Sequence, residues 1–249
     1  MIDVMKEQLH SYLHENGFKD FDLKAVLFDM DGVLYDSMKH HARSWYETMT
    51  EAGYECTSEE FYLHEGRTGA STINLLTERC FNRPATNDEV KSLYARKSEL
   101  FTRYNNGDVI PYAPEMLNKV KADGLECVLV TGSGQKSLLD RLEQNFRGIF
   151  SYNKMVTAFD VKHGKPSPEP YLMGLEKAGH LKPNQAIVVE NAPMGVQAAS
   201  AAGIFTIALT TGPIAPEVLS EAGANIVLPS MQALFNAWED YLPEFKKSV

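Results

Sequence analysis

The stretch from Ala25 to Ser37, AVLFDMDGVLYDS, decides the fold, because an apolar run ends there in two aspartates and a glycine. The run Ala25–Phe28 is short and continuous, which is typical of a parallel strand covered on both faces. Asp29 and Asp31 follow where such a strand ends, and residues two apart in an extended chain share a side. Two carboxylates that close together need a cation to offset their repulsion, and Mg²⁺ prefers such oxygen ligands. Taken alone, the string would also suit an Asx-rich turn.

Composition limits the kinds of protein that this chain can be. The 249 residues suit one large domain or two modest ones, and 44% hydrophobic with 23% charged residues argues against disorder. A net charge of -9 argues against nucleic acid or an anionic membrane as a partner, so an anionic substrate needs a local positive site. The start resembles no leader peptide, no apolar run approaches the ~20 residues of a membrane span, and the three cysteines are scattered. We expect a cytoplasmic monomer that acts on a small phosphorylated substrate.

The sequence from residue 37 to residue 104 is helical in pattern, and no strand signal interrupts it. Ser37 is placed to cap the first of these helices. Two further helix starts have the spacing of capping boxes, namely Thr57 with Glu60 and Thr86 with Glu89. A helical insert directly after the strand that carries Asp29 predicts a cap over the site.

This insert divides the chain into two predicted domains. Residues 37–106 form the helical cap, and residues 1–36 and 107–249 form an α/β core. An extra packing helix is expected within residues 1–17, where Gly17 is placed to end it.

Strands and helices alternate throughout the second half. The expected strands are 127–130, 155–157, 186–189, 204–209 and 225–228, and the expected helices are 114–124, 136–145, 167–179 and 193–203. Together with 25–28, this alternation predicts a doubly wound, Rossmann-like parallel sheet. Ligands of such sheets bind beyond the carboxyl ends of the strands.

Polar residues follow several of these predicted strands. Lys165 precedes one helix, and Glu190 and Asn191 end another strand. The second strand ends in Thr131, Gly132, Ser133 and Gly134. Hydroxyls and backbone N–H groups before a helix suit a phosphate, to which a lysine adds positive charge. Each feature alone would also fit a Gly-rich turn, a solvated lysine or a helix cap. Only their predicted position at one edge of the sheet indicates a site.

In this order the motifs resemble the haloacid dehalogenase (HAD) superfamily of phosphotransferases, in the subgroup with a helical cap that includes β-phosphoglucomutase. The motifs are Asp29-Met30-Asp31-Gly32-Val33, Val130-Thr131-Gly132-Ser133, Lys165-Pro166, and Val189-Glu190-Asn191 leading into Gly195-Val196-Gln197-Ala198-Ala199. The resemblance implies a phosphohydrolase with Asp29 as nucleophile and Asp31 as general acid and base. Thr131 and Lys165 would then hold the transferring phosphate. Mg²⁺ would be bound by Asp29, the main-chain oxygen of Asp31, and the acidic fourth motif, Glu190 and Asn191.

The chain departs from the family pattern at Asn191, where a second aspartate is usual. An amide oxygen can bind Mg²⁺ but brings no charge. Glu65 lies in the cap loop His64-Glu65-Gly66-Arg67-Thr68-Gly69 and could supply the missing carboxylate, although a solvated loop acid is the plain alternative. The combination resembles pyrophosphatase members of the subgroup, which predicts pyrophosphate or another small phosphate compound as substrate.

Two other functions stay open. His41 and Lys97 match cap-side positions of the mutases, which supports a β-phosphoglucomutase or a sugar-phosphate phosphatase. The mutase cap loop has an arginine where this chain has Gly69, and Arg67 is the nearest candidate to bind a second phosphate. A non-catalytic phosphate-binding protein is a remote alternative, because binding alone does not require the nucleophile.

Overall fold

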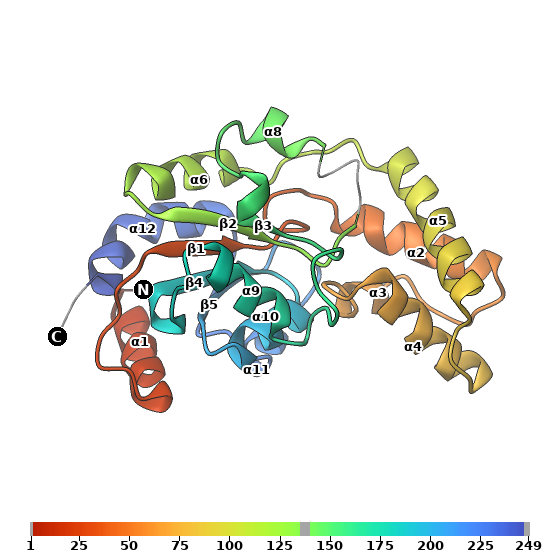
Figure 1. The fold of residues 1–249 in the computed structure, drawn as a ribbon, viewed down its shortest axis with the longest axis horizontal. Helices are drawn as coiled ribbons and strands as arrows, with labels where there is room; N and C mark the ends of the chain where they lie inside the picture. The colour runs from red at the N-terminus through yellow and green to blue at the C-terminus, as the bar shows by residue number, and fades with distance from the viewer. Residues whose placement is uncertain (1, 135–139, 247–249) are drawn as a thin grey trace.

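Within residues 2–134 and 140–246, which this computed structural model describes, six parallel strands form one sheet in the order β3-β2-β1-β4-β5-β6 (Figure 1). The order puts β2 and β3 on one side of β1 and the later strands on the other, so the strand order reverses between β1 and β4. Ligands bind at such a point. The strands are β1 (Ala25–Phe28), β2 (Glu126–Val130), β3 (Met155–Val156), β4 (Ala186–Glu190), β5 (Phe205–Leu209) and β6 (Ile226–Leu228).

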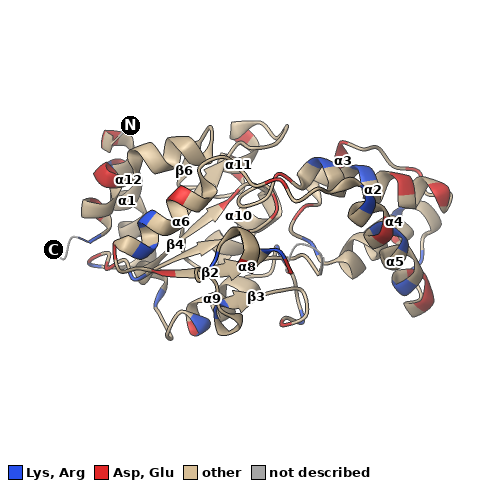
Figure 2. Ribbon diagram, turned by 90° about the horizontal axis from the view of Figure 1, so that it is seen from above, with Lys and Arg blue, Asp and Glu red and all other residues tan. Residues whose placement is uncertain are grey.

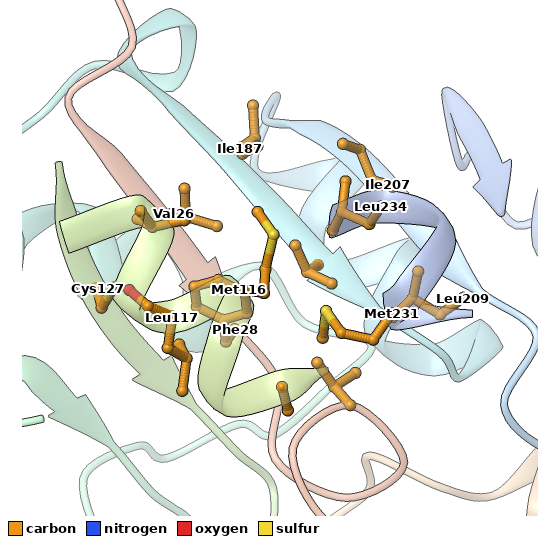
Figure 3. Close-up of a cluster of buried hydrophobic side chains, with 14 of the residues drawn as sticks. Val26, Phe28, Met116, Leu117, Cys127, Ile187, Ile207, Leu209, Met231 and Leu234 are labelled. Carbon is orange, nitrogen blue, oxygen red and sulfur yellow. Dashed lines mark hydrogen bonds between the residues drawn. The ribbon is translucent and has the colours of Figure 1, made fainter. Parts of the chain in front are cut away.

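Side chains of β1 alternate between the two faces of the sheet. Val26 and Phe28 pack with residues of α6 and α12 (Figure 3), in a cluster that also includes residues of α1, whereas Ala25 and Leu27 pack with α9 and α10. All four are buried, as predicted for a strand covered on both faces. The covering helices are α1 (Ile2–Asn16), α6 (Ala113–Ala122), α9 (Glu169–Lys177), α10 (Pro193–Ala201) and α12 (Met231–Phe245). Shorter elements are α8 (Leu142–Asn145), α11 (Pro216–Glu221), η1 (Tyr152–Lys154) and η2 (Pro183–Gln185).

Four helices lie beyond one end of the sheet, away from both chain ends (Figure 1). They are α2 (Met38–Glu51), α3 (Glu60–Leu63), α4 (Gly69–Phe81) and α5 (Asn87–Tyr104). They have a hydrophobic cluster of their own that includes Trp45, Phe61 and Leu76. The predicted fold class, a doubly wound sheet with an inserted helical cap, is confirmed, while the exact domain boundaries stay a prediction.

The two segments that connect this helical insert to the core run side by side. The amide of Asp36 donates to the carbonyl oxygen of Asp108 at 2.9 Å, and the amide of Ile110 donates to that of Leu34 at 2.9 Å. A hydrogen-bonded pair of single strands is the kind of connection about which a cap can rotate.

Helix starts in the insert test the predicted caps. The capping box of Thr86 and Glu89 forms at the start of α5, with bonds of 2.8 and 3.2 Å. Thr57 and Glu60 also exchange bonds, of 3.2 and 3.4 Å, but they do so in the turn before α3, whose N-cap is Glu59, so the capping box predicted there is not at a helix start. The predicted cap at Ser37 is wrong, because its side chain makes no capping bond. Its hydroxyl instead donates to Asp31 Oδ1 at 2.6 Å, and a hydrogen bond to a carboxylate is stronger than one between neutral groups.

Charges on the insert are mixed in sign. Lys, Arg, Asp and Glu are interspersed over α2, α4 and α5 (Figure 2), and several of them pair, as Arg96 does with Glu51 at 2.9 Å. Of the predicted helix 136–145, residues 136–139 lie outside the described residues, and α8 covers only the last four positions. The sequence reading did not anticipate α11 and α12. Across the described chain, no helix combines the length and apolar character needed to cross a bilayer.

Candidate active site

The carboxyl end of β1 brings Asp29 and Asp31 to the end of the sheet. The amide of Asp29 continues the ladder by donating to the carbonyl oxygen of Val189 at 3.0 Å. The chain then turns at Gly32, where φ is +85°. A Cβ at this glycine would lie 2.0 Å from Asn191 Nδ2, so only glycine lets that side chain approach. Both aspartates are buried, with 5% and 2% of their surface exposed.

Lys165 is the cation nearest to Asp29. Its Nζ lies 2.6 Å from Asp29 Oδ1, 2.7 Å from Glu190 Oε1 and 3.1 Å from the carbonyl oxygen of Val130. Burial opposes the charge of this ammonium, but the two carboxylates outweigh burial and raise the Lys165 pKa. For Asp29, burial first and then Glu190 and Asp31 raise the pKa to about 8 against the pull of Lys165. The cluster thus holds more carboxylates than ammonium groups, which favours a further cation.

Glu190 is fully enclosed by protein donors. Its Oε1 accepts from Lys165 Nζ and from the Tyr171 hydroxyl at 2.9 Å, and its Oε2 accepts from the amides of Asn191 at 2.8 Å and Ala192 at 3.1 Å. A Cβ at Gly195 would lie 1.6 Å from Oε1. Glu190 could therefore bind a metal ion directly only by giving up one of these donors.

Asn191, in contrast to Glu190, has a side chain without hydrogen-bond partners among the described residues. It is 3% exposed, and both atoms of its side-chain amide are buried without a hydrogen-bond partner. A buried amide that lacks partners is costly, so such a group marks a place for an ion, a water or a ligand. Together with Asp29 and Asp31 it offers oxygen donors only, which fits a hard divalent cation.

Asp31 contacts residues of the cap. Its Oδ1 accepts from Ser37 Oγ at 2.6 Å and lies 3.0 Å from His41 Nε2, and His41 Nδ1 lies 2.6 Å from Lys97 Nζ. Because an ammonium can only donate, Nδ1 accepts from Lys97 and Nε2 carries the proton that bonds Asp31. Burial raises the Asp31 pKa, but His41, Ser37 and Lys97 together outweigh it and lower that pKa.

Glu65 reaches the same point from the cap loop. One oxygen of Glu65, one of Asp31 and a ring nitrogen of His41 all lie within 4.8 Å of one another. Burial, and next the negative Asp31, raise the Glu65 pKa well above its usual range, although Lys97 opposes this. The structure thus brings Glu65 to the aspartates, and its role as a metal ligand stays a prediction.

The cap loop packs against the core through glycines. A Cβ at Gly132 would lie 2.2 Å from the carbonyl oxygen of Gly66, and one at Gly164 would lie 2.6 Å from Thr68 Cγ2. The cavity between loop and core has a volume of about 30 Å³, room for roughly two water molecules. The cap loop thus lies closed against the core.

The predicted phosphate-binding residues line this cavity. Thr131 is buried, and its Oγ1 accepts from the amide of Ser133 at 2.9 Å; Gly132 and Ser133 lie along the wall. Arg67 also lines it, bonded to Ser71 Oγ at 3.2 Å, while its Nε is buried without a partner. The roles of these residues in phosphate binding stay a prediction.

Several residues of the site were missed by the sequence reading. The cavity is also lined by Trp45, Phe61, His64 and Tyr94, for which the sequence patterns predicted no role in the site. Tyr171 follows Lys165 after a short run of polar and proline residues, yet nothing in the pattern indicates that its hydroxyl faces Glu190.

Comparison with known proteins points to one family. A solved structure from Bacteroides vulgatus, provisionally assigned as a beta-phosphoglucomutase, has a TM-score of 0.96 and 52% identity over 99% of this chain and 100% of that chain. Hexitol phosphatase A of Escherichia coli is 29% identical over 85% of this chain and 93% of its own length. Phosphorylated carbohydrates phosphatase of Thermotoga maritima is 28% identical over 88% of this chain and 100% of its own length. The model of the haloacid dehalogenase-like hydrolases matches residues 26–209, and the chain belongs to that family.

Proposed function

We propose that this HAD-type phosphatase hydrolyses a small phosphate compound in two steps, through an aspartyl-phosphate on Asp29 and with Mg²⁺. The observation that carries the proposal is the contact of 2.6 Å between Lys165 Nζ and Asp29 Oδ1 at the carboxyl end of β1. An anionic nucleophile can approach an anionic phosphoryl group only where fixed positive charge offsets the repulsion.

In the first step an oxygen of Asp29 attacks phosphorus, and the bond from phosphorus to the leaving oxygen breaks. Lys165 and Thr131 bind the phosphoryl oxygens, and Asp31 donates a proton to the leaving oxygen. In the second step a water attacks the phosphorus of the aspartyl-phosphate. Asp31 accepts its proton, and Asp29 is released with inorganic phosphate.

Asp29, the main-chain oxygen of Asp31 and Asn191 are the residues that would hold Mg²⁺, with Glu190 joining only if one of its donors is displaced. When bound, the ion would add positive charge where the transferring phosphoryl group lies. The unpartnered amide of Asn191 supports this assignment.

Pyrophosphate is the substrate that the closed cavity favours. A cavity of about 30 Å³ with Glu65 next to Asp31 leaves little space on the cap side. A compact substrate whose leaving group is itself a phosphate would need less widening of this space than a hexose would.

A carbohydrate phosphate is the second candidate. Trp45, Phe61 and Tyr94 line the cap side of the cavity, and aromatic faces suit the C–H groups of sugars and polyols. The printed names of the E. coli and T. maritima relatives also describe phosphatases of hexitols and carbohydrates.

A direct test is release of phosphate from pyrophosphate, hexose phosphates and hexitol phosphates, with and without Mg²⁺, ranked by kcat/KM. Mg²⁺-dependent turnover with pyrophosphate ranked first supports the proposal. A hexose or hexitol phosphate ranked first replaces the substrate, and conversion of β-glucose 1-phosphate to glucose 6-phosphate without phosphate release would indicate a mutase. Binding of phosphate compounds without any turnover would overturn the catalytic proposal.

A further inference from the structure

Tyr171 is a buried residue for which the mechanism above has no role. It lies on α9, on the face that packs against the sheet, and no part of its surface is exposed. Its hydroxyl donates to Glu190 Oε1 at 2.9 Å, and the centre of its ring lies 4.9 Å from Lys165 Nζ. It therefore contacts both members of the ion pair behind Asp29.

The ammonium of Lys165 has three N–H donors, and three acceptors surround it. These are Asp29 Oδ1, Glu190 Oε1 and the carbonyl oxygen of Val130. In this closed arrangement all three donors are engaged, so the direction of the side chain depends on where each acceptor lies; a bound phosphoryl group would take over one of these donors. The carbonyl oxygen of Val130 is held in place by strand β2. The position of Glu190 Oε1 therefore decides whether the ammonium lies toward Asp29 or away from it.

The position of Glu190 Oε1 depends in turn on Tyr171. Oε2 is fixed by the main-chain amides of Asn191 and Ala192, whereas Oε1 is bonded only by Lys165 and the Tyr171 hydroxyl. Without that hydroxyl, Lys165 would be the one remaining donor to Oε1 among the described residues. The carboxylate would then draw the ammonium toward itself.

We propose that Tyr171 is a positioning residue that keeps the ammonium of Lys165 on Asp29, acting through Glu190. The inference rests on the proposed function, since it assumes that Lys165 offsets charge during phosphoryl transfer. The hydroxyl sets the direction of the carboxylate, and the ring covers the side of the ammonium that faces α9, where the attraction between cation and ring adds to the effect.

A purely structural role would leave a different signature. For packing alone phenylalanine would serve as well, because a buried hydroxyl is costly unless it is bonded. The hydroxyl of Tyr171 therefore makes a difference through the bond to Glu190, and Tyr171→Phe isolates that bond while it keeps the ring.

The first experiment compares the kinetics of Tyr171→Phe with wild type. We expect kcat to fall about 10- to 100-fold, as for other groups that orient a charged partner of the reacting atoms. KM should change less than about threefold, because correct placement of the ammonium matters most in the transition state. Tyr12→Phe is the matched control: it removes a buried hydroxyl that donates to the Gly203 carbonyl oxygen at 2.7 Å, far from the site, and should leave kcat unchanged.

A double-mutant cycle separates positioning from general damage. In a Lys165→Met background, Tyr171→Phe should change kcat for p-nitrophenyl phosphate less than about twofold, because its effect passes through the missing ammonium. This activated ester keeps the residual rate measurable. Effects that multiply would show that Tyr171 acts by another route and overturn the inference.

A crystal structure of Tyr171→Phe provides a readout that does not depend on turnover. We expect Lys165 Nζ beyond hydrogen-bond distance of Asp29 Oδ1 and still bonded to Glu190. If Nζ stays 2.6 Å from Asp29, or if kcat equals that of wild type, the inference is wrong. A wild-type protein that hydrolyses no phosphate compound would refute the proposed function instead, and the crystal structure would still test whether Tyr171 positions Lys165.

Discussion

The two buried lysines of the site, Lys165 and Lys97, lie on opposite sides of the boundary between core and cap and have opposite surroundings. Each is 2% exposed. Lys165 contacts two carboxylates of the core, which outweigh burial and raise its pKa. The ring of His41 is the one hydrogen-bond partner of Lys97 among the described residues, and burial lowers the Lys97 pKa to about 8 against the opposing effect of Glu65 and Asp31. The surroundings thus favour the charged form of Lys165 and disfavour that of Lys97.

The difference follows from the elements that carry the neighbours. Asp29, Lys165 and Glu190 all follow or face strands of one rigid sheet, so their geometry does not depend on the cap. The partners of Asp31 come from the insert, with His41 on α2 and Lys97 on α5. The proposed nucleophile, Asp29, therefore has its partners within the core. The proposed acid and base, Asp31, has partners on the cap, which it would contact only when the cap is closed.

The largest effect is expected from a substitution on the core side of the site. Asp29→Asn removes the nucleophile, so we expect kcat to fall at least about 10³-fold while the melting temperature changes little. Phosphate release and thermal unfolding measure the two quantities. Asparagine can deamidate to aspartate, so mass spectrometry of the purified variant is the control. Residual activity above a few per cent in an undeamidated sample would contradict the aspartyl-phosphate intermediate.

The second largest effect is expected at Asp31, whose side chain contacts Ser37 and His41. Asp31→Asn should lower kcat roughly 10²–10⁴-fold for substrates with poor leaving groups, because the leaving oxygen lacks its proton donor. The loss should be smaller for p-nitrophenyl phosphate, whose leaving group departs without a proton. Rates with a series of esters of different leaving-group pKa test this. Equal losses across the series would exclude an acid and base role.

The third effect tests whether closure brings Glu65 to the metal site. Glu65→Ala should lower pyrophosphate turnover about 10- to 100-fold and weaken its dependence on Mg²⁺, because a carboxylate near the ion is lost. Turnover of larger phosphate esters should fall less or rise, since the cavity widens. Asn191→Asp in the same chain should partly restore pyrophosphate turnover.

Glu59→Ala, which removes an exposed acid of the same cap segment, is the control for Glu65→Ala. Pyrophosphate kinetics that do not change in Glu65→Ala would contradict the ligand role and leave Glu65 as a wall of the cavity.

Sequence patterns predicted the core side almost completely. Short apolar runs predicted the strands, and each polar residue that ends a strand must lie at the same edge of a parallel sheet, so Asp29, Thr131 and Lys165 could be placed together before any coordinates. The resemblance to the family then suggested their roles.

The cap side and the interior bonds were harder to predict. The Ser37 hydroxyl had a local option, the helix start, and a distant one, Asp31, and spacing along the chain reveals only the local one. Tyr171 and His64 likewise depend on contacts between separate elements. Such contacts are set by how helices pack on the sheet, which the periodicity of one helix does not determine.

The smallest effect sharpens the contrast between the two lysines. Lys97→Met should raise the free energy of unfolding by roughly 1–3 kcal/mol at pH 7, because it removes a buried charge that is poorly compensated. Between pH 8 and 10.5 the unfolded wild-type chain binds a proton that folded Lys97, with a pKa of about 8, has already lost. Wild-type stability therefore rises with pH across this range, and the advantage of the variant should shrink to near zero. Urea unfolding in EDTA at pH 7, 8, 9 and 10 measures the difference, with Lys91→Met, an exposed lysine on the same helix, as control. A stability difference that stays constant from pH 7 to pH 10 would show that Lys97 keeps its proton throughout, and the electrostatic contrast with Lys165 would then fail.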